Sequence, residues 1–413
     1  MSNQIGKPER ASQNRVIQLF QDELGYTYLG DWEEEVRTQP IEEDLLFKYL
    51  TKNNRYSSEL AQKALDALVK AATNLSDDLY EANKEVYKLL RYGVTVREEL
   101  GQPKETVWLI DWKNPTSNDF AVAEEVTVAG KHTKRPDVVL FVNGIALGVI
   151  ELKRSKVGVE EGIRQNLDNQ KPEFIEKYFT TMQLVMAGND TQGLRYGTIE
   201  TSEKYYLKWK EDGDKEFDYL LDKHISQLCE KSRILELVHD FVVFDKGVKK
   251  LCRPNQYFGI TAAQENIRTK QGGIIWHTQG SGKSLTMVWL TKWIRENVKD
   301  SRVLIITDRE ELDDQIEKLF TGVDEKIYRT KSGRDLINVL NHKTEMLIGS
   351  LVHKFGRKSD EGDYDSFIED LKASLGSDFK AKGDIYVFVD ECHRTQSGKL
   401  HDAMKLILPC STT

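Results

Sequence analysis

A glycine-rich turn in the second half of the sequence carries the most specific chemistry. It lies between a short apolar run at 273–276, expected to form a strand, and a helical pattern over 285–298. A strand, a glycine-rich turn and a helix in this order form a phosphate-binding loop, in which backbone N–H groups face phosphate oxygens. Lys283 is expected to contact the β and γ phosphates, and Ser284 to coordinate Mg²⁺. The residues expected to surround the nucleotide are Thr278, Gln279, Gly280, Ser281, Gly282, Lys283 and Ser284.

An acidic pair follows the last strand-like run of the sequence. Residues 385–389 are apolar and end in Asp390-Glu391. An Asp at the carboxyl end of a strand in a parallel sheet is well placed for Mg²⁺. Glu391 can then orient and deprotonate an attacking water. With the phosphate loop, this pair predicts ATP hydrolysis, although His277 replaces the first glycine of the usual loop pattern.

A second chemical cluster lies in the first half. Asp137 begins a strand-like run at 138–142, and a run at 145–150 leads to Glu151 and Lys153. Residues two apart on a strand share a face, so Glu151 and Lys153 lie together. Two carboxylates, Asp137 and Glu151, can hold Mg²⁺ against a phosphodiester, while Lys153 stabilises developing charge or positions water. The pattern predicts metal-dependent phosphodiester hydrolysis.

The register between these two strands decides whether the carboxylates meet. A simple two-residue turn at Asn143-Gly144 would pair Asp137 with Ile150 and place Glu151 on the opposite face. Bringing Asp137 and Glu151 together needs an offset of one residue. We predict this offset, through a three-residue loop or a bulge after Gly144.

The elements that position these residues indicate two kinds of domain. Residues 40–100 are helical in pattern, and strand-like runs follow at 107–112, 120–128, 138–142 and 145–152, which predicts an α+β first half. Beyond residue 253, short apolar runs alternate with longer helical patterns, which predicts a parallel sheet with crossover helices. The fold class is therefore α/β in the second half.

Composition limits the class of protein. The 413 residues suffice for two or three domains, and no apolar stretch is long enough to span a bilayer. The polar N-terminus lacks a signal-peptide core, so we infer a cytoplasmic protein with no membrane partner. The net charge of −8 disfavours a passive DNA-coating protein but allows an enzyme that grips DNA in a local channel. Four scattered cysteines form no zinc pattern.

The second half resembles superfamily 2 helicases and translocases. Asp390-Glu391-Cys392-His393 resembles their motif II, of the DECH type. Arg253 and Gln256 lie in a segment similar to the one that reads adenine, since a Gln side chain can satisfy both the donor and the acceptor on the adenine edge. The runs 303–309 and 346–350 are similar to motif Ia and the strand and turn that follow it. In that family, these two runs lie near the nucleic-acid strand.

The first half resembles the PD-(D/E)xK nucleases, through Pro136-Asp137 and Glu151-x-Lys153. That family often carries a Gln-x-x-x-Tyr helix after the lysine. Gln165 stands where the Gln belongs, but position 169 is Asn, so Gln165 is a weaker assignment than the three core residues. The resemblance also implies an acidic residue from the first helix, for which Glu42 and Glu43 are the candidates.

A nuclease ahead of such a motor resembles the R (restriction) subunit of type I restriction-modification enzymes, over roughly residues 37–408. The run 276–284 is close to that family's phosphate loop. The resemblance implies a PD-(D/E)xK endonuclease domain over 1–240 and an N-terminal RecA-like ATP-binding domain over 241–413. It also implies ATP-driven translocation of double-stranded DNA, with Mg²⁺-dependent cleavage away from the recognition site. The implied partners are the methyltransferase (M) and specificity (S) subunits, with S-adenosylmethionine needed only by the complete complex.

The sequence ends before the second RecA-like domain and its arginine finger. We therefore expect a fragment or truncated product that binds nucleotide weakly, does not translocate, and hydrolyses ATP slower by a factor of roughly 10³ or more. Two alternatives remain: another ATP-dependent helicase–nuclease, type III-like or for repair, and a non-catalytic remnant that binds DNA or subunits. The nuclease-first order and the loop at 276–284 favour the type I assignment.

Overall fold

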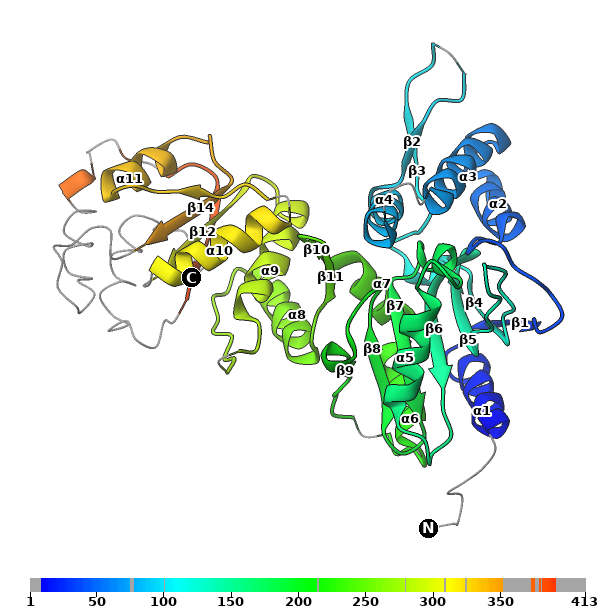
Figure 1. Cartoon of the computed structure of the whole chain (residues 1–413). Coiled ribbons are helices and arrows are strands. Elements are labelled where there is room, and N and C mark those ends of the chain that lie inside the picture. Colours follow the sequence, from blue (N-terminus) through cyan, green and yellow to red (C-terminus); the bar gives the residue numbers. More distant parts are fainter. Residues whose placement is uncertain are drawn as a thin grey trace. The chain divides into compact units, whose positions relative to one another are not determined.

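The computed structural model describes the chain except for residues 1–8, 75–77, 100, 214, 279, 308–309, 324, 352–372, 376–378, 380 and 391–413. Two units are distinguished, Met1–Pro254 and Asn255–Thr413 (Figure 1). From the sequence we expected the boundary at 240/241. The hairpin of β10 (Val242–Asp245) and β11 (Val248–Leu251) instead groups with the first unit. The reason is that Lys249 on β11 is buried there and donates to Oδ1 of Asn83 at 2.8 Å.

A seven-stranded mixed sheet organises the first unit, in the order β1-β4-β5-β6-β7-β8-β9 (Figure 1). The β1–β4 and β6–β7 pairs are parallel and the others are antiparallel. The central strands are apolar along nearly their whole length because both faces of the sheet are covered. The strands are β1 (Thr27–Asp31), β4 (Phe120–Glu124), β5 (Val138–Val142), β6 (Ile145–Leu152), β7 (Leu184–Asn189), β8 (Gly193–Gly197) and β9 (Leu207–Lys208).

Helices pack on both faces of this sheet. On α5 (Val159–Asn169), Gly162 lies against Ala187 of β7. On α6 (Leu220–Leu228), Leu221 lies against Gly188, the next residue of β7. Successive strand residues point to opposite faces, so α5 and α6 cover opposite sides of the sheet. Helix α1 (Glu9–Asp22) contacts α6, β1, β4 and β6.

The helical pattern predicted over 40–100 is confirmed as far as Tyr92 and is wrong beyond it. It comprises α2 (Glu43–Thr51), α3 (Ser58–Thr73) and α4 (Leu79–Tyr92), and the β2 (Val94–Val96)–β3 (Glu105–Val107) hairpin follows. The side chains of Ser57 and Asp78 cap α3 and α4 at their N-termini. The strand predicted over 107–112 is wrong, because Leu109 and Ile110 are buried in a loop rather than in a ladder.

The second unit contains a parallel four-stranded sheet with crossover helices, as the sequence predicts. The strand order is β13-β14-β12-β15, and the three pairs that these strands form are parallel. The strands are β12 (Ser301–Thr307), β13 (Tyr328–Arg329), β14 (Leu347–Leu351) and β15 (Asp384–Val389). The helices are α8 (Pro254–Arg268), α9 (Lys283–Asn297), α10 (Glu310–Gly322) and α11 (Gly333–Asn341).

One predicted strand of this unit is absent. Residues 271–278 form no strand, and Ile274 and Trp276 are 77% and 83% exposed. The run was predicted to be a buried strand because it is apolar. Its backbone forms no strand, and its side chains line a cavity. Within the described part of the chain, every helix falls short of the length and apolarity that crossing a bilayer requires.

Candidate active sites

The β5–β6 hairpin contains the offset that the sequence predicts. Its turn has two residues with positive φ, Asn143 (53°) and Gly144 (82°), and Val142 pairs directly with Ile145. A bulge follows, because Phe141 pairs with Ala146 whereas Leu140 pairs with Gly148, which leaves Leu147 as the additional residue. Val138 consequently pairs with Ile150, so the next pair outward is Asp137 and Glu151.

The three predicted catalytic residues of the first unit converge at this point. The backbone N–H of Leu152 donates to Oδ2 of Asp137 at 2.6 Å. Nζ of Lys153 donates to Oε1 of Glu151 at 3.0 Å and to the Leu152 carbonyl at 2.9 Å. The Glu151 side chain is fully buried, whereas that of Lys153 keeps 13% exposure. Burial and the Asp137 carboxylate together raise the pKa of Glu151 well above its ordinary value.

The donor set fits a magnesium ion. Oε2 of Glu151 is buried and accepts no hydrogen bond from the described residues. A buried carboxylate oxygen without a donor is costly unless a cation or water satisfies it. Within the described ranges no group of three or more His, Cys, Asp and Glu could form a metal cage. Mg²⁺ is commonly held by only one or two carboxylates together with substrate phosphates, so Asp137 and Glu151 suffice.

Helix α5 covers the carboxylate pair. A Cβ atom added to Gly162 would lie 3.0 Å from Cβ of Ala187 and 3.5 Å from Cγ of Glu151. The helix can therefore approach this closely only with a glycine there. Gln165 lies one turn further along the same helix and is partly exposed. Its role at the site stays a prediction.

The candidates for an additional acidic residue are placed elsewhere. The backbone N–H of Glu42 donates to the Gly144 carbonyl at 2.8 Å, so α2 begins beside the turn of the hairpin. Strand β5 separates that turn from Asp137. The Glu42 carboxylate pairs with Arg37 at 2.9 Å, and the exposed Glu43 pairs with Gln39. The expectation that Glu42 or Glu43 completes the pair is wrong, because a five-residue strand is longer than a Glu side chain.

Sequence reasoning missed a different neighbour of the site. Nε2 of Gln13, on α1, donates to the backbone carbonyl of Asp137 at 3.2 Å. Gln13 is 3% exposed. The apolar residues Val16, Ile17 and Phe20 at helical spacing could have indicated α1. No local signal indicates a contact between residues 124 positions apart.

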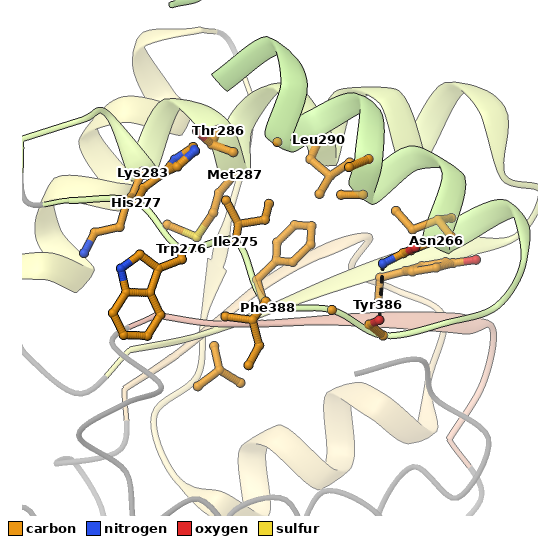
Figure 2. Close-up of a pocket in the computed structure, with 18 of the residues that line it drawn as sticks. Asn266, Ile275, Trp276, His277, Lys283, Thr286, Met287, Leu290, Tyr386 and Phe388 are labelled. Atoms are coloured by element: carbon orange, nitrogen blue, oxygen red, sulfur yellow. Dashed lines mark hydrogen bonds between the residues drawn. The ribbon is translucent and has the colours of Figure 1, made fainter. Parts of the chain in front are cut away.

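In the second unit, Lys283 and Asp390 line one cavity of about 640 Å³ between α8, α9, β15 and residues 271–277 (Figure 2). Lys283 is the first residue of α9, and Gly282 before it has φ 87°. Asp390 directly follows β15 and is buried, and its N–H donates to the Ile306 carbonyl. The structure thus places the lysine predicted to contact phosphates and the aspartate predicted to coordinate magnesium at the same cavity. Figure 2 shows Trp276 beside Lys283.

Two residues of the α8 region hold the phosphate loop. Nε2 of Gln256, which is 2% exposed, donates to the Gly282 carbonyl at 2.9 Å. Gln256 is predicted to read adenine; in this structure its amide supports the peptide that precedes Lys283. Nε2 of His277 lies 3.1 Å from the Asn255 carbonyl, which gives a structural use to the residue that replaces the usual glycine.

The other predicted nucleotide-binding residues are placed as follows. Ser284 is the second residue of α9, and Ser281 donates its N–H to the Thr278 carbonyl at 3.2 Å. Gly280 is exposed with φ 77°, and Arg253 is exposed just before α8. Gln279 and Glu391, with Cys392 and His393, lie outside the described residues.

Comparisons with known proteins agree with both halves. Residues 7–204 match the family described as the type I restriction enzyme R protein N terminus, and residues 255–413 match the SWI2/SNF2 ATPase family. The chain is 29% identical to the type I restriction enzyme HindI endonuclease subunit of Haemophilus influenzae, over 84% of this chain and 35% of that protein. It is 26% identical to the putative type I restriction enzyme MjaIXP endonuclease subunit of Methanocaldococcus jannaschii, over 96% of this chain and 41% of that protein.

The chain spans between about a third and two fifths of the length of these relatives. The two matched families follow each other in the order that the sequence motifs predict, and together they cover most of the chain. The second unit, with its parallel sheet and phosphate loop, is consistent with a RecA-like ATPase fold. The chain therefore combines a domain of the type I restriction enzyme R protein N-terminal family with a SWI2/SNF2-type ATPase domain, and the relatives it resembles are named type I restriction enzyme endonuclease subunits.

Proposed function

We propose that this chain supplies the DNA-cleavage centre and the first ATP-binding domain of a type I restriction endonuclease. The observation that carries the proposal is the convergence of Asp137, Glu151 and Lys153 at one end of the β5–β6 hairpin. These three residues are distant in sequence from the ATP site, and a bulge brings them together. Binding of ATP alone does not require such a centre.

Asp137 and Glu151 would hold Mg²⁺. Bound there, the ion supplies positive charge that polarises a phosphodiester and makes water a nucleophile near neutral pH. Leu152 fixes one oxygen of Asp137, and burial fixes Glu151. Lys153 is held by Glu151 and by the Leu152 carbonyl, so its ammonium lies beside the carboxylates. From there it stabilises negative charge that develops on the scissile phosphate.

The ATP site would use the N-terminus of α9. Backbone N–H groups of the loop and Lys283 contact the phosphates, and Ser284 and Asp390 coordinate the magnesium ion that accompanies ATP. Gln256 keeps the loop in place by its bond to Gly282. The adenine contacts of Arg253 and Gln256, and the role of Glu391 as general base, belong to the same proposal.

In the complete enzyme, ATP hydrolysis would drive translocation of double-stranded DNA, and the nuclease would cut away from the recognition site. The M and S subunits would be the partners, and S-adenosylmethionine would act only in that complex. Support comes from the relatives, which are named type I restriction enzyme endonuclease subunits. A specific DNA sequence is then read by a different chain.

Nicking of supercoiled plasmid tests the cleavage centre. We expect Mg²⁺-dependent nicking by the 413-residue chain, lost in Lys153→Ala and retained in Lys156→Ala. Lys156 is an exposed lysine three residues further along, so its variant controls for the loss of positive charge near the site. Equal nicking by both variants would show that the observed cleavage does not use the proposed centre.

A further inference from the structure

Helix α1 is tied to the edge of the sheet where the cleavage centre lies. Strands β1, β4, β6 and β7 run in the same direction, so their carboxyl ends meet at the edge where β5 begins with Asp137. Two arginines and a serine of α1 reach these strand ends and α6. The contacts are Arg10 to Asp31 (3.0 Å) and Glu124 (3.3 Å), Arg15 to Asp222 (2.9 Å) and to Asp190, and Ser12 to Asp190 (2.9 Å).

Gln13 lies between these ties and contacts the cleavage centre itself. Its buried amide donates to the Asp137 carbonyl at 3.2 Å, and the same carbonyl accepts the Glu125 N–H at 2.9 Å. Oδ2 of Asp137 accepts the Leu152 N–H at 2.6 Å. Three donors from α1, the end of β4 and the end of β6 therefore restrain one aspartate at both its backbone and its carboxylate.

We infer that Gln13 is a positioning residue that holds Asp137 in the geometry needed to share a magnesium ion with Glu151. The inference rests on the magnesium centre proposed above. Two carboxylates this close repel each other while no cation lies between them. Asp137 is the residue before the first pair of β5, and its carbonyl is held there by the Glu125 N–H. The Gln13 amide adds a second restraint on the same carbonyl, from a helix outside the sheet.

The expected loss of Mg²⁺ affinity on removing the Gln13 amide is that of a contact that orients a metal ligand. Removing the residue that orients a metal ligand typically weakens metal affinity about 10–100-fold, although the ligand itself is unchanged. Helix α1 keeps its other ties without Gln13, because Arg10, Ser12 and Arg15 anchor it independently. A loss of affinity in a Gln13 variant therefore reports the contact to Asp137 rather than detachment of the helix.

Calorimetric titration of the nucleotide-free 413-residue chain with Mg²⁺ tests the inference. Gln13→Leu removes the donor and keeps most of the side-chain volume. Gln170→Leu is the matched control, because Gln170 is also buried and donates to one helix carbonyl, that of Asn166 at 2.9 Å, away from Asp137. We expect Gln13→Leu to weaken Mg²⁺ binding about 10–100-fold and Gln170→Leu to leave it unchanged, at similar losses of thermal stability.

Nicking kinetics give a second readout. The Gln13→Leu variant should need more Mg²⁺ for half-maximal nicking, while its maximal rate at saturating Mg²⁺ stays near that of the wild type. Wild-type Mg²⁺ affinity in Gln13→Leu, or an equal loss in Gln170→Leu, would overturn the positioning role and leave the magnesium centre intact. A wild-type chain that binds no Mg²⁺ would overturn the centre and the positioning role together.

Discussion

The backbone N–H of Leu152 donates a 2.6 Å hydrogen bond to the Asp137 carboxylate, so the strand that carries Glu151 and Lys153 directly holds the other acid of the cleavage centre. This bond is possible only because the bulge at Leu147 shifts β6 by one residue against β5. The register of one hairpin thus determines whether the chain has a cleavage centre.

Deletion of Leu147 should retain Mg²⁺ binding. Removing the additional residue leaves Leu140 opposite Gly148, so the hairpin becomes regular and Asp137 still faces Glu151. Leu147→Ala is the comparison, since it removes the same buried side chain but keeps the bulge. We expect Leu147→Ala to lose about 2–5 kcal/mol of stability and also to retain Mg²⁺ binding. Circular dichroism identifies conditions under which both variants are folded, and calorimetry then measures the metal. Loss of Mg²⁺ binding in a folded deletion variant alone would mean that the bulge itself, and not the pairing of Asp137 with Glu151, is what the metal requires.

In the metal-free protein, the stability of Glu151→Gln relative to the wild type should increase as the pH rises. Burial and Asp137 raise the pKa of Glu151, so the folded state retains a proton that the unfolded state releases. Below the ordinary pKa of a glutamate, Glu151 is protonated in both states and the folded wild type keeps its full stability. As the pH rises from there through the raised pKa of Glu151, the unfolded state releases the proton first, and the wild type loses stability. From about pH 5 upward, the free energy of unfolding of Glu151→Gln minus that of the wild type should therefore increase with pH.

Chemical denaturation in the presence of a chelator measures this difference. Glu161→Gln changes an exposed acid on α5 and should show no such trend. A constant difference between Glu151→Gln and the wild type across this pH range would mean that Glu151 ionises normally.

Gly162→Val should disturb the cleavage centre through α5. The new side chain would meet Ala187 and Glu151, which lie 3.0 Å and 3.5 Å from the position of its Cβ. Glu161→Val places the same β-branched residue on the exposed side of the helix. Helix propensity disfavours Glu161→Val slightly and favours Gly162→Val, so a larger loss of stability in Gly162→Val reports the clash. We expect a lower melting temperature and weaker Mg²⁺ binding only in Gly162→Val. Similar behaviour of the two variants would mean that α5 can move away without consequence.

Gly282→Ala should weaken ATP binding through a clash with Gln256. The added Cβ would lie 2.4 Å from Nε2 of Gln256, in a backbone conformation with φ 87°. A fluorescent ATP analogue should bind at least about tenfold more weakly, which corresponds to about 1.4 kcal/mol.

The double variant Gly282→Ala/Gln256→Ala separates the clash from the backbone strain. If the clash dominates, the double variant should bind the analogue better than Gly282→Ala alone, a coupling that a mutant cycle quantifies. Additive losses would assign the effect of Gly282→Ala to backbone strain, and an unchanged affinity in Gln256→Ala alone would contradict the supporting role of Gln256. Gly280→Ala gives the strain reference, because φ is 77° there and no atom lies within 4 Å of the added Cβ.

Local patterns explain which parts of this structure the sequence predicted. The Asn143-Gly144 turn and the strand-like runs on either side are short-range signals, and they sufficed to predict a hairpin. The offset was predicted because Asp137 and Glu151 must meet to share a metal ion. The parallel sheet of the second unit followed from the spacing of its apolar runs. The prediction of a strand at residues 273–276 was wrong because an apolar run is equally typical of a buried strand and of a cavity wall.

Long-range contacts explain most of what the sequence did not predict. Gln13 reaches Asp137 across 124 positions, and nothing in its neighbours specifies that partner. Glu42 was a reasonable candidate by order along the chain, but order does not say at which end of a hairpin a helix begins. The helix that does reach Asp137 is α1, which lies ahead of the predicted helices.

Direct measurement of Mg²⁺ binding to the nucleotide-free chain tests the central claim, that Asp137 and Glu151 form a metal centre. Asp137→Asn removes one charge with little change of shape, and Asp119→Asn does the same at an exposed aspartate that pairs with Lys52. The account predicts calorimetric Mg²⁺ binding in the wild type and in Asp119→Asn, and its loss in Asp137→Asn. The same Mg²⁺ affinity in all three proteins would contradict it.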